Sequence, residues 1–191
     1  MTITQSIIYA SIFFWLFPIF RQYKGNYFLY FLILGLSDPI AMLCVAVLNV
    51  QPTLIHSVAA IFLYYSIDTV RREFRRLWLL NLIIIVAFII ALLMQSNPLF
   101  LILVLHFFIL LIFIKKLMLK LYQSGGFNWF YLALIFYEIT VILKVIVFIS
   151  GTDVGILYFY LTLAFQFLIA IFFTIFREES SLLRIRLRSF P

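Results

Sequence analysis

The stretch Leu99-Phe-Leu-Ile-Leu-Val-Leu-His-Phe-Phe-Ile-Leu-Leu-Ile-Phe-Ile114 is followed directly by Lys115-Lys116. Its only polar side chain is that of His106. A helix needs about 20 apolar residues to cross the ~30 Å hydrocarbon core of a bilayer. This stretch comes close, and it can extend into residues 115–121 because lysine side chains reach back to the membrane surface. It therefore predicts a transmembrane helix.

Six further segments of this kind lie on either side. Apolar residues make up 66% of the chain and charged residues 11%, which is more apolar surface than a soluble domain of 191 residues could bury. The sequence predicts an all-α polytopic membrane protein, a bundle of seven transmembrane helices in one domain (residues 1–176) with a short basic tail (residues 177–191). The other six segments are Ile3–Phe20, Tyr27–Val50, Thr53–Val70, Leu77–Met94, Phe127–Ser150 and Val154–Phe176.

The positive charges predict an orientation for this bundle. Thirteen of the fourteen Lys and Arg residues lie in alternate connections or in the tail, and the fourteenth is Lys144. The connections at residues 49–52, 95–98 and 151–153 contain no Lys or Arg. Short cytoplasmic loops carry the excess of Lys and Arg. We therefore expect a multi-pass protein of the cell (inner) membrane with its N-terminus outside and its C-terminus in the cytoplasm.

The same topology explains the net charge of +7, so no nucleic-acid partner is expected. The expected partners are the lipid bilayer, anionic lipid headgroups and a cytoplasmic signalling protein. The tail alternates basic and apolar residues, so it either lies along the membrane surface or frays. The residues expected to make the cytoplasmic contacts are Arg71, Arg72, Arg75, Arg76, Arg184, Arg186 and Arg188.

Ionisable side chains inside membrane helices are costly, and they are candidate functional residues for that reason. Asp38 and Glu138 each lie about 16 Å from the inner ends of their helices, and Gln166 lies about 18 Å from the outer end of its helix. These three are near the midplane. His106 and Lys144 are nearer the outside, on consecutive helices, and could meet. We expect these five residues to line a pocket for a ligand or a proton.

Two of these residues raise further expectations. Pro39 follows Asp38, lacks an amide donor and clashes with the carbonyl of Gly35, so a helix kink is expected there. Glu138 and Lys144 are six residues apart on one helix, about 120° from alignment, so each needs a partner on another helix. Lys144 either faces the pocket or snorkels to the outer headgroups.

No cofactor and no metal are expected. The only histidines, His56 and His106, lie at different depths, which disfavours a haem held by both. No cluster of His, Cys and carboxylates has metal-ligand spacing, and no glycine-rich phosphate loop occurs. Cys44 is the only cysteine, which leaves no intrachain disulfide.

An internal repeat is a further hypothesis. Asp38 and Glu138 lie at the same depth in helices of the same direction, 100 residues apart, and Gly25–Tyr27 matches Gly125–Phe127 at that offset. This suggests two three-helix halves joined by the fourth helix, a layout known from seven-helix transporters of the sugar-porter and PQ-loop type. Their motif is missing here, since Ile139 stands opposite Pro39. No family can be claimed on these residues.

Three functions remain open from the sequence. The first is a membrane sensor or signalling partner that binds a small or lipophilic ligand, or a proton, in the buried polar pocket. The second is a small proton-coupled or solute transporter with the 3+1+3 helix layout. The third is an intramembrane lipid-modifying enzyme that uses Asp38 and Glu138 as acid and base, which would require the two carboxyls to face one space. The first is preferred, and the sequence leaves enzymatic activity open while favouring its absence.

Overall fold

The computed structural model describes residues 3–67, 78–93, 98–124, 126–152 and 154–186. This part of the chain is almost entirely helical, which confirms the all-α prediction. Four helices, α2, α6, α7 and α8, are long and apolar enough to cross a membrane. The α-helices are α1 (Ile3–Arg21), α2 (Phe28–Leu48), α3 (Pro52–Ser66), α5 (Trp78–Leu93), α6 (Leu99–Ser124), α7 (Trp129–Ser150) and α8 (Gly155–Ile175).

The helix ends follow from local sequence. At the end of α2, Asn49 adopts the left-handed conformation (φ 51°), and Pro52 begins α3, where its missing amide costs nothing. Gly151 ends α7 in the left-handed conformation (φ 62°). At the other end of α7, the Asn128 side chain accepts a hydrogen bond of 2.9 Å from the amide of Phe130. These signals confine each helix to one crossing of the bundle.

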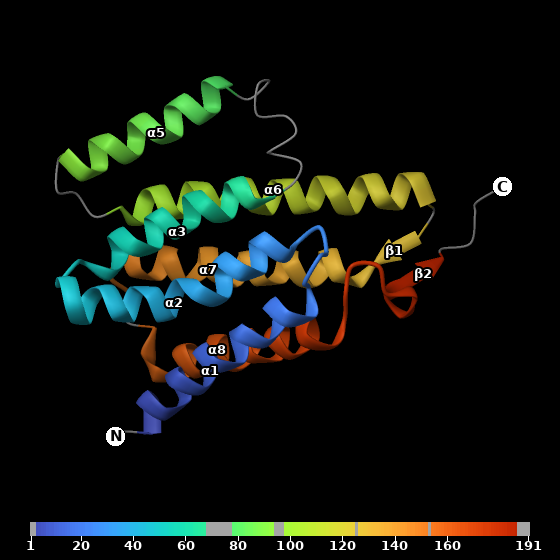
Figure 1. Cartoon of the computed structure of the whole chain (residues 1–191), viewed down its shortest axis with the longest axis horizontal. Helices are drawn as coiled ribbons and strands as arrows, with labels where there is room; N and C mark the ends of the chain where they lie inside the picture. Colours follow the sequence, from blue (N-terminus) through green and yellow to red (C-terminus); the bar gives the residue numbers. More distant parts are fainter. Residues whose placement is uncertain (1–2, 68–77, 94–97, 125, 153, 187–191) are drawn as a thin grey trace.

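Six of the helices form a closed ring. Each contacts two main neighbours, in the order α1, α2, α3, α6, α7, α8 and back to α1. Helices that are consecutive in the chain run in opposite directions, so the ring neighbours α3 and α6, and likewise α8 and α1, run in the same direction (Figure 1). The helix α5 lies outside the ring next to α6. The phenol of Tyr65 on α3 donates a hydrogen bond of 3.1 Å to the amide oxygen of Asn81 on α5. The ring therefore consists of two helix triplets, with α5 at its edge.

The first half of α2 packs very closely against α1. A Cβ atom on Gly35 would lie 2.6 Å from the backbone oxygen of Trp15, closer than real Cβ atoms come. Gly35 therefore permits a close helix contact, a role that the sequence did not indicate, and the kink expected at Pro39 stays a prediction. The helix α2 continues through Pro39 as one element, and the hydroxyl of Ser37 donates to the carbonyl of Leu34 (2.9 Å).

An aromatic core fills one half of the ring. Its side chains come from α2, α6, α7 and α8 and from the residue before α2, and at most 2% of their surface is exposed. Phe31 and Phe173 have ring centroids 4.8 Å apart, and the rings of Phe130 and Phe173 are 5.2 Å apart. The core thus closes the ring across its full width. Its members are Tyr27, Tyr30, Phe31, Phe113, Phe130 and Phe173.

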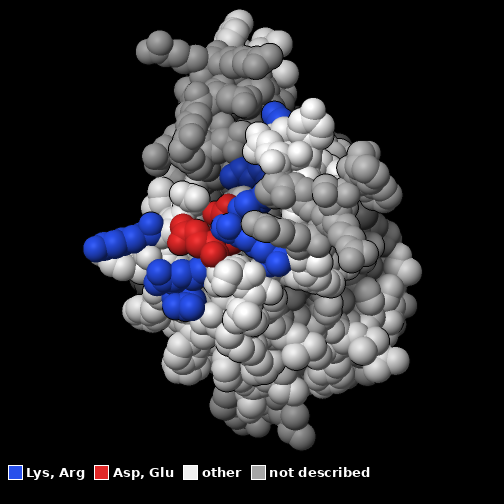
Figure 2. Space-filling view, turned by 90° about the vertical axis from the view of Figure 1, so that its right-hand side faces the viewer, with Lys and Arg blue, Asp and Glu red and all other residues white. Residues whose placement is uncertain are grey.

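The chain after α8 folds back against the end of the bundle beside this core, which we call the tail end. A short 3-10 helix (Ser181–Leu183) leads into β2 (Arg184–Arg186), which pairs antiparallel with β1 (Gly126–Asn128), just before α7. Figure 2 faces the tail end and shows Lys and Arg side chains around a small acidic group. The opposite end, where α2 meets α3 and α7 meets α8, is called the mouth end below.

Candidate functional site

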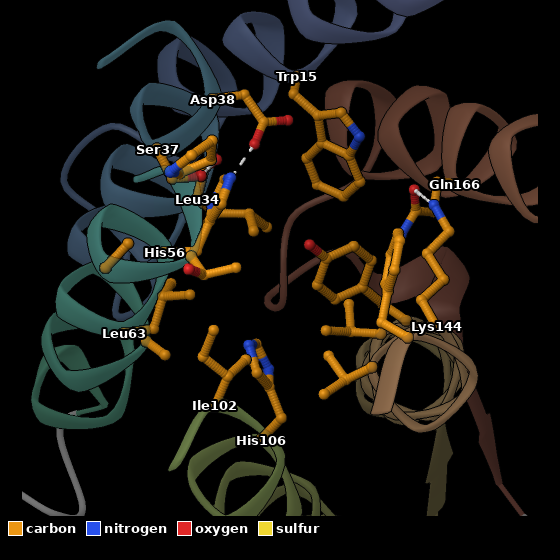
Figure 3. A pocket seen from close by; sticks show the side chains of 18 of the residues that line it. Trp15, Leu34, Ser37, Asp38, His56, Leu63, Ile102, His106, Lys144 and Gln166 are labelled. Atoms are coloured by element: carbon orange, nitrogen blue, oxygen red, sulfur yellow. Dashed lines mark hydrogen bonds and ion pairs between the residues drawn. The ribbon is translucent and has the colours of Figure 1, made fainter. Parts of the chain in front are cut away.

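A cavity of about 440 Å³ lies within the ring, between the aromatic core and the mouth end. All six ring helices line it. The cavity extends to the mouth end, because its lining includes three residues near the helix ends there: Pro52, Leu99 and Phe148. Its volume is in the range of sites for small molecules. Its lining residues with a carboxyl, imidazole, amine or amide group are Asp38, His56, His106, Lys144 and Gln166 (Figure 3).

A hydrogen-bonded group of three side chains lies at the floor of the cavity. His106 on α6 lines the cavity, and its Nδ1 is joined to Oε2 of Glu138 on α7 by a hydrogen bond of 2.7 Å. The phenol of Tyr30 on α2 donates to the other carboxyl oxygen. Glu138 and Tyr30 are completely buried. Each carboxyl oxygen has a partner, which offsets the cost of burying this group.

A second polar pair lies on the wall formed by α7 and α8. Nζ of Lys144 donates a hydrogen bond of 2.6 Å to Oε1 of Gln166. Both residues line the cavity. Lys144 therefore faces inward, the first of the two alternatives that the sequence left open. Its ammonium group is positioned by a neutral amide.

The facing wall, formed by α2 and α3, carries a looser pair. Oδ1 of Asp38 lies 4.0 Å from Nδ1 of His56, and their side chains are 53% and 40% exposed. This distance is too long for a hydrogen bond. Figure 3 shows the Asp38 carboxyl pointing into the cavity, across from Lys144 and Gln166. The Asp38 carboxyl is therefore open to the cavity.

The structure distributes the five predicted pocket residues differently from the expectation. Asp38, His106, Lys144 and Gln166 line one cavity, but Glu138 lies behind His106 and does not line it. His106 pairs with Glu138 and not with Lys144. The two acids thus face different spaces. This separation disfavours an enzyme that would use them as paired acid and base.

A second polar cluster holds the tail end together around Glu178, just after α8. One carboxyl oxygen of Glu178 accepts hydrogen bonds from Tyr131 (2.5 Å) and Lys120 (3.1 Å), and the other accepts one from Asn26 (3.1 Å). Burial alone would raise the pKa of this carboxyl. The hydrogen bonds from Tyr131 and Asn26 and the charge of Lys120 outweigh burial and hold the pKa below its ordinary value.

Gln22 ties the end of α1 to the end of α8 in the same region. Its amide nitrogen donates to the carbonyls of Phe173 (3.0 Å) and Phe176 (2.8 Å). Lys116 on α6 donates to the phenol of Tyr27 (2.9 Å), at the edge of the aromatic core. The tail end is thus a hydrogen-bonded junction of α1, α2, α6, α7 and α8.

The predicted cytoplasmic contact residues are only partly described. Arg184 is exposed in β2 opposite Asn128, and the backbone of Arg186 pairs with Gly126. For this part of the tail, the structure gives a short strand in place of a frayed end, and the expected position along the membrane surface stays a prediction. The other members of the predicted set lie outside the described residues: Arg71, Arg72, Arg75, Arg76 and Arg188.

Several residues of the two sites were not predictable from the sequence. Tyr30 is one, because a tyrosine near the start of a membrane helix is typical of an interfacial belt. His56 and Glu178 were missed because His56 was weighed only as a metal or haem ligand and Glu178 lies in a basic segment. The nearest signal for Tyr30 is its position two helical turns before Asp38 on the same helix. Side-chain partners on other helices carry no local signal.

In the described ranges, no three His, Cys, Asp or Glu side chains are grouped so as to hold a metal ion. The fold and the site together define a helical-bundle protein with four helices suited to crossing a membrane and a polar cavity enclosed by six helices. No family model, curated protein or solved structure matches this chain.

Proposed function

We propose that the chain is a seven-span membrane receptor that binds a small ligand in the cavity from outside the cell. The tail end faces the cytoplasm in this proposal, because the connections and tail that carry thirteen of the fourteen Lys and Arg residues belong to that side. The mouth end then faces outward, and its connections contain no Lys or Arg. A ligand would enter the cavity at the mouth end.

The cavity is the observation that carries this proposal. It has a volume of about 440 Å³, polar groups on opposite walls and an apolar lining. Small-molecule sites combine these features: an apolar wall supplies affinity, and a few placed polar groups orient the ligand. The aromatic core closes the cavity on the cytoplasmic side. A closed floor suits a receptor, which needs no path through the bundle.

Signal transmission would run from the cavity floor to the tail end along rigid helices. A ligand that displaces His106 moves its partner Glu138 and, through Glu138, Tyr30. Each of these residues lies on a helix that also reaches the tail end. There, α6 carries Lys120, α7 carries Tyr131, and Asn26 lies just before α2. These are the three residues that bind Glu178. Packed helices with discrete arrangements carry this kind of coupling. The cytoplasmic partner would read the position of the tail.

A small transporter is the second candidate, and one observation favours it. The helix α5 lies outside the ring, with α1–α3 before it and α6–α8 after it. Two triplets joined by a peripheral helix are the 3+1+3 layout expected for a transporter built from parallel halves. A transporter must open the same cavity to each side in turn, whereas a receptor opens it to one side only.

Side-specific thiol labelling separates the two functions. In a Cys44→Ser background, Ser37→Cys places a thiol in the cavity wall. Tyr122→Cys, 90% exposed near the end of α6, is the tail-end control. A membrane-impermeant maleimide added outside should label residue 37 and spare residue 122, and in inverted vesicles the pattern should reverse. Labelling of residue 37 from both sides would indicate a transporter. Labelling of residue 37 from the inside only would overturn the proposed orientation and the receptor.

A further inference from the structure

The two walls of the cavity carry opposite charges that do not neutralise each other directly. Asp38 projects from α2, and Lys144 projects from α7 across the ring (Figure 3). Among the residues that the structure describes, no carboxylate oxygen lies within 4.0 Å of Nζ of Lys144. Its hydrogen-bond partner is the neutral amide of Gln166. Asp38 lies 4.0 Å from His56, too far for a hydrogen bond. Both charges therefore remain available to a ligand.

Apolar side chains line most of the cavity around these two charges. The ring of Trp15 is buried beside that of Tyr137, with their centroids 4.9 Å apart, and both residues line the cavity. Further large apolar residues line the cavity, among them Ile12, Leu63, Val141, Phe148, Phe159 and Leu163. A ligand with an apolar body would displace water from these surfaces, which stabilises the bound state. The cavity therefore presents one positive and one negative contact, separated by an apolar slot.

Only one class of ligand matches the positive contact, the negative contact and the apolar slot of this cavity together. An organic anion would pair with Lys144 and cover Asp38 without giving its carboxyl a hydrogen-bonded counter-charge, and an organic amine would do the reverse. A neutral ligand would leave both charges without such a partner. A charge that a bound ligand removes from water without pairing it is costly. A zwitterion supplies a carboxylate and an ammonium group together, and each meets the opposite charge.

We propose that the cavity binds a small zwitterion with an apolar body, its carboxylate held by Lys144 and Gln166 and its ammonium group held by Asp38. This proposal rests on the proposed ligand-binding function and names the ligand class of that same cavity. Two kinds of compound share this chemistry. In an apolar α-amino acid both charges are on one carbon, and in an ω-amino acid they are at the two ends of the chain.

The test uses two sets of three probes on the purified full-length protein. One set is leucine, isocaproate, which lacks the amine, and isoamylamine, which lacks the carboxylate. The other set is ε-aminocaproate, caproate and hexylamine. Affinity is measured by calorimetry and by the rise in unfolding temperature. We expect at least one zwitterion to bind about 10- to 100-fold more tightly than both of its single-charge analogues, as for a charge-assisted hydrogen bond. The set that shows this difference identifies the type of amino acid.

Variants then assign each end of the ligand. Lys144→Met should weaken the zwitterion about 10- to 100-fold and should not weaken the matching amine, which no longer leaves a charge at residue 144 unpaired. Asp38→Asn should weaken the zwitterion similarly and should not weaken the matching acid, for the same reason. Lys144→Arg and Asp38→Glu keep the charges and should retain most of the affinity, which shows that the loss is not misfolding. Lys115→Gln, exposed on α6 far from the cavity, should change none of these affinities.

Two results would overturn the ligand class. In one, neither zwitterion binds more tightly than its analogues. In the other, the variants weaken all three probes of a set to the same extent. If either occurs while the thiol at residue 37 is still labelled from outside, the receptor proposal stands and only the ligand class fails. If residue 37 is labelled only from the inside, both proposals fail.

Discussion

Oε2 of Glu138 lies 2.7 Å from Nδ1 of His106, and this contact joins α7 to α6 at the cavity floor. His106 is 5% exposed and lines the cavity, whereas Glu138 is completely buried behind it. Tyr30 on α2 binds the same carboxyl from the far side. The carboxyl therefore holds together three helices that are spread around the ring. Its replacement should affect stability and any response to a ligand.

The first prediction concerns this carboxyl. Glu138→Leu removes both acceptors and leaves the buried phenol of Tyr30 and the ring of His106 without their partner, so the free energy of unfolding should fall by about 1–3 kcal/mol. Glu138→Gln keeps one acceptor oxygen and should lose less. Thermal unfolding of the purified variants in detergent measures the difference. A Leu variant as stable as the unaltered protein would show that the three-residue group does not contribute to stability.

The second prediction concerns the contact of α1 with α2. Gly35→Ala places a methyl group 2.6 Å from the backbone oxygen of Trp15, so the two helices must separate. Overpacking of this kind should destabilise the protein by about 1–3 kcal/mol. Gly151→Ala is the matched control, because no atom lies within 4 Å of its added Cβ and only the left-handed backbone is strained. If both variants unfold at the same temperature, close helix packing is not the role of Gly35.

The third prediction concerns pH and the tail. The pKa of Glu178 lies below its ordinary value in the folded protein, so the folded state binds fewer protons at this site than the unfolded state. Its contribution to stability is therefore fully present above the unfolded pKa of about 4.3 and is lost as the pH falls through the folded pKa. The protection of the β2 amides from hydrogen exchange, relative to the intrinsic rate at each pH, should fall over that acidic range. Glu178→Gln should remove this pH dependence and raise exchange at neutral pH. Unchanged protection at low pH would contradict the prediction.

The fourth prediction concerns orientation. A reporter fused after Pro191 should be active only if it requires the cytoplasm, and one inserted after Thr152 should be active only if it requires the outside. An alkaline phosphatase and a fluorescent protein at each site provide the paired measurement. A fluorescent, phosphatase-inactive insertion after Thr152 would contradict the seven-span, N-outside arrangement.

Hydropathy was sufficient to predict the helices but not their neighbours. The expected segment Leu99–Ile114 with its lysine extension became the single helix α6, because an apolar run has little alternative in a membrane. The pairing of helices depends on side chains from distant segments. His106 and Lys144 both line the cavity, on the neighbouring helices α6 and α7. However, Lys144 faces α8, and Glu138, about 120° away on the same helix, faces α6 and α2.

The tail shows why local pattern alone was insufficient there. The alternation of basic and apolar residues from Arg184 has a period of two, which is the period of a strand. A strand forms only when a second strand lies beside it, and β1 comes from residues nearly sixty positions earlier. The partner was not recognisable, because Gly126–Asn128 is too short to carry a strand signal. The sequence therefore predicted only a tail that lies along the membrane surface or frays.

A ring of helices closed on itself has a mechanical property that a row of helices lacks. Each of the six helices contacts two main neighbours, and α1 completes the ring with α8. No helix can tilt alone without opening a gap on one side and a clash on the other, because packed interfaces resist both. The six helices should therefore move together, so that the ring widens or narrows as a whole. A small change in width, shared by six interfaces, would alter the whole aperture at the mouth end.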